Sequence, residues 1–223
     1  MRSFATLLLP ALAAASPILN GPGMGENAIS GDAPNPKEIQ FTTAKTSGAG
    51  CPQGSVTTTF SPDMTVVTFG FDGFQTYIGP GYTRSDSNKN CQLHLNLKYP
   101  GGYQFAVFSS VYHGWAQLDE GVTGQFTSTY FFSQDASATT TTTTSIVGGG
   151  VWANGNVYTK EDKVPTSSYI WSPCGGTGIL NINNRIILST NDRSGKLQGE
   201  VTNDDATIKI EHQLNLNWRT CKK

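Results

Sequence analysis

Four cysteines, Cys51, Cys91, Cys174 and Cys221, stand at the edges of a run of short alternating segments and constrain the fold more than any other feature. In an oxidising compartment an even number of cysteines usually forms disulfides. We favour bridges Cys51–Cys91 and Cys174–Cys221, since each closes a loop of several strands. The nested pairing, Cys51 with Cys221 and Cys91 with Cys174, is the main alternative. No C-x-x-C spacing favours zinc.

The N-terminus predicts that compartment. Residues 1–15 resemble a secretory signal peptide, with Arg2 as the positive end, an apolar stretch at 4–12 and small residues at 13–15. A membrane-spanning helix needs about 20 apolar residues, and no run of that length follows. We therefore expect a secreted, extracellular protein without a membrane partner.

The remaining chain divides into two zones. Residues 16–45 are rich in Pro and Gly without a hydrophobic period, which predicts a flexible N-terminal tail, with a propeptide as the alternative. Residues 46–223 are long enough to form the core of a single domain. The formal net charge of −1, with 14% charged residues, argues against nucleic acid as a partner.

Strict alternation predicts half-buried strands at 91–99 and 207–218, where apolar side chains share one face. Less regular strands are expected at 55–60, 64–71, 103–112, 122–132, 139–146, 156–159, 167–171 and 180–188. About ten short strands joined by Gly/Pro turns predict an all-β fold. We expect an antiparallel two-sheet β-sandwich, jelly-roll-like and disulfide-braced, while periodicity leaves a closed barrel open.

Several short stretches resemble a secreted fungal family catalogued as domain of unknown function 4360. They are Gly50-Cys51-Pro52-Gln53, Asn90-Cys91-Gln92-Leu93, Tyr99-Pro100-Gly101-Gly102, Trp171-Ser172-Pro173-Cys174, Leu180-Asn181-Ile182-Asn183 and Trp218-Arg219-Thr220-Cys221. The resemblance spans roughly residues 46–221, and the surroundings of the cysteines are its specific part. It implies a small exported protein with these four cysteines, and it carries no activity to transfer.

The catalytic signatures G-x-S-x-G, H-E-x-x-H and the P-loop are absent, so no catalytic residue, metal site or cofactor is assigned. The weak catalytic candidates are His113, beside aromatic residues and Gly114, and the adjacent carboxylates Asp119 and Glu120. Each also has a plain structural interpretation, as a strand histidine and as a turn with solvated charges. The segment starting at Asp86 begins like a calcium loop, but Cys91 stands where that loop needs Gly.

Aromatic residues among many amides suggest binding instead. Exposed aromatic faces contact sugar rings, and Asn, Gln and Thr can bond the hydroxyls. Trp152, Tyr112 and Trp115 are the candidates, and Trp152, between Gly150 and Gly155, is expected to be exposed. The first hypothesis is a non-catalytic binding or wall-associated module, whose partner is a polysaccharide or an extracellular protein. A jelly-roll hydrolase or lyase, and an effector or structural wall protein, are the alternatives. The sequence leaves the oligomeric state open.

Overall fold

The computed structural model describes residues 33–202 and 210–221, so the expected signal peptide at 1–15 lies outside the described residues. Short helices and twelve strands follow along the chain. They are η1 (Pro36–Glu38), β1 (Gln40–Ser47), β2 (Val56–Phe60), β3 (Val66–Phe71), β4 (Thr76–Ile78), β5 (Asn88–Tyr99), β6 (Tyr103–Leu118), β7 (Val122–Phe132), β8 (Asp135–Val147), η2 (Gly150–Trp152), β9 (Asn156–Lys163), η3 (Thr166–Ser168), β10 (Gly176–Thr190), β11 (Gly199–Thr202) and β12 (Ile210–Thr220). No helix in the described ranges is long and apolar enough to cross a membrane.

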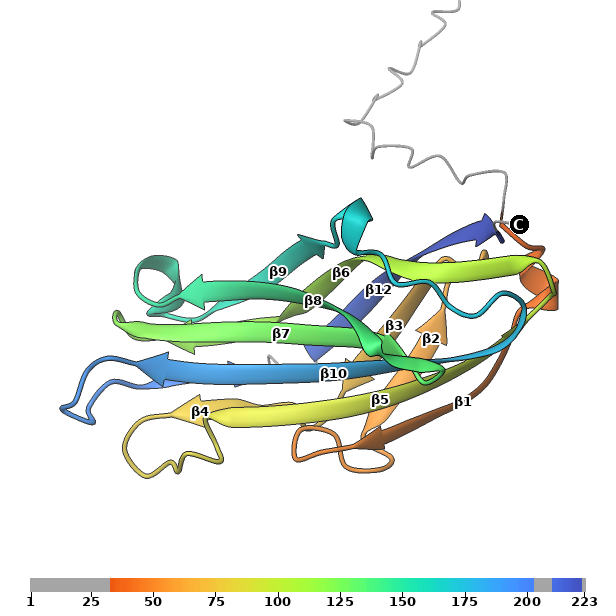
Figure 1. Ribbon diagram of the computed structural model, residues 1–223. Coiled ribbons are helices and arrows are strands. Elements are labelled where there is room, and N and C mark those ends of the chain that lie inside the picture. The colour runs from red at the N-terminus through yellow and green to blue at the C-terminus, as the bar shows by residue number, and fades with distance from the viewer. Residues whose placement is uncertain (1–32, 203–209, 222–223) are drawn as a thin grey trace, which may run out of the picture.

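Two antiparallel sheets form two layers (Figure 1). One has five strands in the order β1-β5-β10-β7-β8, and the other has seven, in the order β2-β3-β12-β6-β11-β4, with β9 on β6. Within the described ranges no ladder joins the two sheets, so the chain is a sandwich and not a closed barrel. The predicted all-β, two-sheet, disulfide-braced class is confirmed.

In the seven-stranded sheet, two strand positions are each occupied by two strands that follow one another end to end. Strand β3 pairs with β12 and β4 pairs with β11, while β12 and β11 both pair with β6. Strand β4 therefore continues the line of β3, and β11 continues the line of β12. Strand β9 pairs with the opposite edge of β6, so β6 is central. The short strands β4 and β11 thus lie beside the C-terminal half of β6, at one end of the sandwich.

The core lies between the sheets and follows the predicted alternation. In β5, Leu93, Leu95 and Leu97 are fully buried, whereas the intervening side chains are at least partly exposed. In β12, Leu214 and Trp218 point to the same core from the opposite sheet. Burying large apolar side chains from both sheets is the main stabilising contribution to such a fold, at roughly 1.5–3 kcal/mol per side chain.

Some predicted boundaries were wrong. Strand β1 pairs with β5 from Gln40 to Ser47, so residues 40–45 belong to the folded domain and not to the expected flexible tail. Residues 16–32 of that expected tail lie outside the described residues. The segment 167–171 is not a strand, since it contains the end of η3 followed by irregular chain. Strands β4 and β11 were not predicted, because neither is long enough to show a period.

Both disulfides have the favoured pairing, Cys51–Cys91 and Cys174–Cys221. The first bridge is fully buried and joins the segment after β1 to β5. The second joins the chain before β10 to the end of β12, and Cys174 is exposed. The two bridges therefore tie together segments about 40 and 47 residues apart, in different solvent environments.

A polar network crosses the otherwise apolar core. His212 of β12 is fully buried, and its Nδ1 accepts from Asn184 Nδ2 at 3.2 Å. Asn184 Oδ1 accepts from the Ser128 hydroxyl, which also bonds the hydroxyl of Tyr112. The His212 Nε2–H reaches the Tyr130 hydroxyl at 3.4 Å. Side chains from four strands thereby satisfy one another away from water.

Candidate functional site

The three catalytic candidates are not brought together. His113 lies on the outer face of β6, half-buried, with Nδ1 at 2.9 Å from Thr159 Oγ1 of β9. Asp119 and Glu120 form the turn between β6 and β7. Glu120 is exposed, whereas Asp119 is half-buried and lines a hollow. Of the three, only Asp119 has a place in a concave surface described below.

The three binding candidates are less exposed than expected. Tyr112 is 1% exposed and stacks on His212, so it is a core residue and its predicted binding role is corrected. Trp152 was expected to be exposed, but it is half-buried and packs against the core. Trp115 is half-buried beneath the turn at Gly155, where an added Cβ would lie 2.2 Å from the ring. These aromatic residues contribute to packing first.

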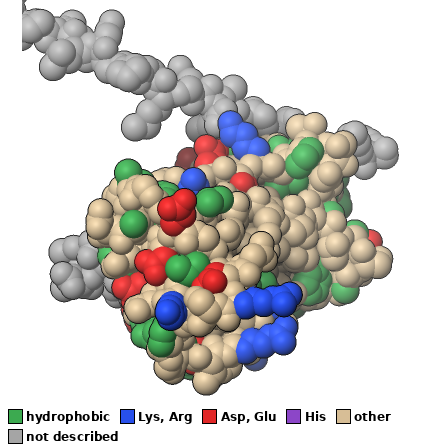
Figure 2. Space-filling model, turned by 90° about the vertical axis from the view of Figure 1, so that its left-hand side faces the viewer, with side chains coloured by type: hydrophobic (Ala, Val, Ile, Leu, Met, Phe, Trp, Pro, Cys, Tyr) green, Lys and Arg blue, Asp and Glu red, His purple; other side chains and the backbone are tan. Residues whose placement is uncertain are grey.

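A different group of residues forms a hollow at the loop end of the sandwich, where β6 and β10 end and β5, β7, β9 and β11 begin. This end is at the left in Figure 1 and faces the viewer in Figure 2, where acidic side chains lie among apolar and basic ones. The hollow has a volume of about 340 Å³ and is called the acidic hollow below. Its lining residues are Tyr77, Ile78, Tyr82, Gln117, Asp119, Gln198, Gly199 and Glu200.

Strand register explains why these side chains meet. Glu200 of β11 lies opposite Tyr77 of β4 on one side and opposite Gln117 of β6 on the other. Directly opposed residues in a sheet point to the same face. All three are partly exposed, whereas their strand neighbours Val201 and Leu118 are buried. A row of tyrosine, carboxylate and amide therefore crosses the outer face of the sheet.

Tyr82 completes the hollow from the loop between β4 and β5. Its ring is stacked on that of Tyr77, with centroids 5.0 Å apart and planes 11° apart. Tyr77 covers one face of Tyr82, and Tyr82 remains 51% exposed. A side chain this large and exposed is unusual in the described chain, where few large apolar residues lie open to solvent.

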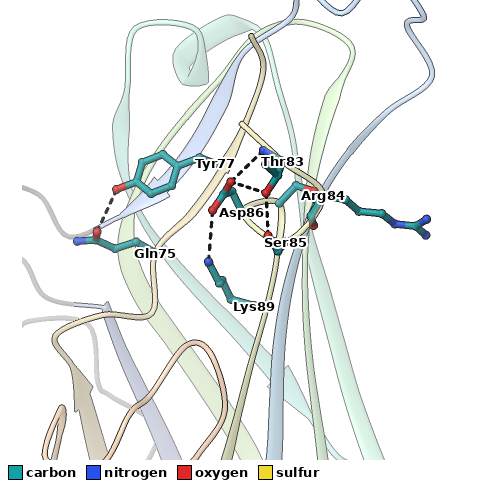
Figure 3. Close-up of polar contacts among 8 residues, drawn as sticks. Gln75, Tyr77, Thr83, Arg84, Ser85, Asp86 and Lys89 are labelled. Atoms are coloured by element: carbon teal, nitrogen blue, oxygen red, sulfur yellow. Dashed lines mark hydrogen bonds and ion pairs between the residues drawn. The ribbon is translucent and has the colours of Figure 1, made fainter. Parts of the chain in front are cut away.

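A hydrogen-bonded turn follows Tyr82 in the chain, and Figure 3 shows the contacts of its Asp86. The Asp86 carboxylate accepts from the Thr83 backbone N–H at 2.9 Å and from the Thr83 hydroxyl at 2.7 Å, and Lys89 lies 3.6 Å away. The Tyr77 N–H donates to the Asp86 carbonyl at 2.9 Å. Hydrogen bonds from Thr83 lower the pKa of Asp86. Its carboxylate is thus occupied by the turn, which connects β4 to the loop.

A second hollow adjoins the acidic hollow at the loop between β4 and β5. Its volume is about 260 Å³, and Ile78 and Tyr82 line both hollows. Arg84, Thr190 and Asp192 are among its other lining residues. We call the two hollows together with Tyr82 the tyrosine groove. The two hollows adjoin at Tyr82, so a ligand that crosses this ring contacts both of them.

The acidic hollow contains two carboxylates in different environments. Burial raises the pKa of the half-buried Glu200. Burial, followed by the charge of Glu200, also raises the pKa of Tyr77. Asp119 accepts a hydrogen bond from the Gln198 backbone N–H at 2.8 Å, which connects the β6–β7 turn to the chain before β11. The hollow therefore combines aromatic faces, amides and carboxylates.

Sequence reasoning missed Glu200, Tyr77 and Tyr82. Tyr77 and Glu200 lie on the two short strands that were not predicted, so their pairing could not be foreseen. Tyr82 follows Gly79-Pro80-Gly81, which indicates a turn but not an aromatic stack. The described ranges contain no group of three side chains that could hold a metal ion.

Comparisons with known proteins add family information. The family described as domain of unknown function (DUF4360) matches residues 37–221. An uncharacterized secreted protein of Arthroderma benhamiae is 38% identical over 193 residues, which cover 86% of this chain and 75% of that protein. A solved structure of TmCBM61 in complex with beta-1,4-galactotriose aligns with 82% of this chain and 91% of its own, at 13% identity and a TM-score of 0.24. That TM-score is too low to transfer a ligand or a site.

Proposed function

The chain belongs to the DUF4360 family, and from that premise we propose that it is an exported, non-catalytic module that binds a glycan chain in the tyrosine groove. The observation that carries the proposal is the stacked pair of Tyr77 and Tyr82, with one face of Tyr82 left open. Sugar rings present flat apolar C–H faces, and such faces pack on aromatic rings.

Polar groups around the tyrosines suit a hydroxylated ligand. Gln117 and Glu200 lie in one row beside Tyr77, and Gln198 and Asp119 form the adjoining wall. Amide groups both donate and accept hydrogen bonds, and carboxylates accept them, which are the bonds that sugar hydroxyls need. Binding sites for small ligands commonly combine apolar faces with a few such polar groups.

Export has independent support. The relative from Arthroderma benhamiae is a secreted protein, and the chain carries two disulfides of the kind that persist in oxidising compartments. The predicted signal peptide agrees with both. A secreted module of this kind meets extracellular and cell-wall polysaccharides directly.

A retention series on insoluble polysaccharides and on polysaccharide-containing native gels tests the proposal. Wild type should be retained by at least one glycan, and Tyr82→Ala should weaken that binding at least about fivefold, since a packed aromatic contact is worth about 1 kcal/mol. Tyr169→Ala is the matched control, because Tyr169 is a half-buried tyrosine between β9 and β10, at the opposite end of the sandwich. Retention by no glycan, or equal binding by wild type and Tyr82→Ala, would refute the proposal.

One observation favours a second candidate function, a glycoside hydrolase. Asp119 and Glu200 line one hollow, and the raised pKa of Glu200 is the property that a general acid requires. Release of new reducing ends from the retained glycan separates the two functions. A binding module releases none. Release by wild type that disappears in both Glu200→Gln and Asp119→Asn would establish the hydrolase.

A further inference from the structure

We propose that the glycan bound in the tyrosine groove carries free primary amines, as a glucosamine polymer does, and that Asp119 and Glu200 bind its ammonium groups. The inference rests on the proposed function and names the class of its ligand. It depends on the charge, the partners and the aromatic surroundings of these two carboxylates.

The acidic hollow has two carboxylates and no cation of its own. None of its lining residues is Lys, Arg or His. Among the described residues, the Glu200 carboxylate has no hydrogen bond and no ion pair. The salt bridge found in those ranges joins Lys89 to Asp86 and does not involve Glu200. A half-buried carboxylate without a cationic partner favours a ligand that supplies the positive charge.

Asp119 is held ready for the same ligand. Its Oδ2 accepts the Gln198 N–H at 2.8 Å, which fixes the carboxylate against the neighbouring segment. The other oxygen has no bond to a described residue. An ammonium group has three donors, so it can bond a carboxylate oxygen while its remaining donors reach a second acceptor or water. Charge-assisted bonds of this kind are stronger than those between neutral groups.

The aromatic walls fit an ammonium-bearing sugar as well as a neutral one. Tyr77 lies directly opposite Glu200 in the sheet, and its ring stacks on Tyr82. A cation bound at Glu200 therefore lies near the Tyr77 ring, and aromatic rings attract cations through their quadrupole. The same open ring of Tyr82 supports the apolar face of the sugar. Neutral glycans would gain only the second of these contacts.

The second hollow accommodates the continuation of the chain. It shares Ile78 and Tyr82 with the acidic hollow, and it contains both a cation, Arg84, and a carboxylate, Asp192. The carboxylates that would bind an amine, Asp119 and Glu200, therefore lie on one side of Tyr82 only. A ligand that crosses Tyr82 should need an amine only on the units that enter the acidic hollow, so partly acetylated chains should also bind.

The test uses isothermal titration of the mature protein with glucosamine oligomers and with N-acetylated oligomers of the same length, at about pH 6, where amines are charged and most carboxylates are ionised. Wild type should bind the amine-bearing oligomers up to about tenfold more tightly. Glu200→Gln and Asp119→Asn should each lose about two- to fivefold more affinity for those oligomers than for the acetylated oligomers. Added salt should reduce the preference.

The matched control is Glu120→Gln, which removes the same charge from the exposed residue next to Asp119, outside both hollows. It should retain wild-type preference. Equal affinity for the two oligomers overturns the amine inference and leaves the proposed function standing. An equal loss in Glu120→Gln also overturns it, because the attraction is then general charge. If wild type binds no glycan in either test, the proposed function fails first and this inference fails with it.

Discussion

Mild acid should destabilise this protein through one buried histidine. Burial lowers the pKa of His212 from 6.5 to about 3, because the imidazolium would have to form between the sheets without solvent. His212 is 0% exposed, and its ring stacks on that of Tyr112 with the two ring centroids 4.4 Å apart. The unfolded chain, by contrast, can protonate this histidine near its ordinary pKa. Folding is therefore linked to proton release.

The hydrogen bonds of His212 define the neutral form. Since Asn184 Oδ1 accepts from Ser128, the Asn184 amide N–H must point to His212 Nδ1, which therefore carries no proton. The proton sits on Nε2, on the side of Tyr130. Adding a proton to Nδ1 would set two donors against each other. Relief would require Asn184 to turn over, which would reverse the direction of its hydrogen bond with Ser128.

The expected magnitude follows from linkage. Below about pH 6.5 the unfolded chain binds one more proton than the folded chain, so stability falls as the pH falls towards the folded pKa of about 3. Each pH unit in that window removes about 1.4 kcal/mol, so acidification from about pH 7.5 to about pH 5 should cost about 2 kcal/mol. Burial raises the pKa of Asp162 and Glu200, which acts in the opposite direction, but both are partly exposed and solvent screening keeps their effect small.

Urea unfolding at these two pH values, followed by tryptophan fluorescence, measures the difference. His212→Gln should be less stable at neutral pH but should lose most of the pH dependence, whereas His113→Gln, on the outer face of β6, should keep it. If wild type loses less than about 0.5 kcal/mol between the two pH values, the assignment of His212 as a buried neutral residue is refuted. That outcome would not depend on whether the His212 variant folds.

Two further predictions concern packing and crosslinks. Gly114→Ala should lower the free energy of unfolding by about 1–3 kcal/mol, because the added Cβ would lie 2.7 Å from Oη and 2.9 Å from Cζ of the buried Tyr158. Gly101→Ala, whose Cβ would meet no heavy atom within 4 Å, should be close to neutral, and thermal unfolding of both variants measures the difference. Limited reduction followed by alkylation and peptide mapping should label Cys174 and Cys221 before Cys51 and Cys91, because Cys174 is exposed and the other bridge is buried; simultaneous labelling would contradict this order.

Burial along the long strands could be predicted because successive side chains of a strand point to opposite faces of the sheet, so the apolar positions fix which face is buried. In β5, the apolar positions Leu93 to Leu97 alternate with polar ones, and a slip of one residue would expose every leucine. The same holds for β12, where even His212 follows the apolar row. The sequence favoured the observed disulfide pairing but left the nested pairing open. Burial along the strands depends on local pattern, which a single sequence contains.

The candidate site could not be predicted because it depends on register between distant segments. Glu200 meets Tyr77 across about 120 residues of chain, on strands of four and three residues that show no period. Adjacent Asp119 and Glu120 looked like a pair, yet the turn sends them to different surroundings. Trp152 looked exposed because it stands among glycines, but a half-buried tryptophan gains more from packing on the core.

A titratable group with a shifted pKa can belong to a functional site or can be a core residue whose hydrogen bonds are satisfied by its neighbours. Access to solvent separates the two cases here. His212 has a large pKa shift, but it is sealed between the sheets and both of its ring nitrogens have partners. The pKa of Glu200 is raised, but Glu200 lies in an open hollow beside a second carboxylate, and no described residue bonds its carboxylate. A ligand can improve the environment of Glu200 and cannot reach His212. For that reason the acidic hollow, and not the buried polar network, is where a partner of this chain should be sought.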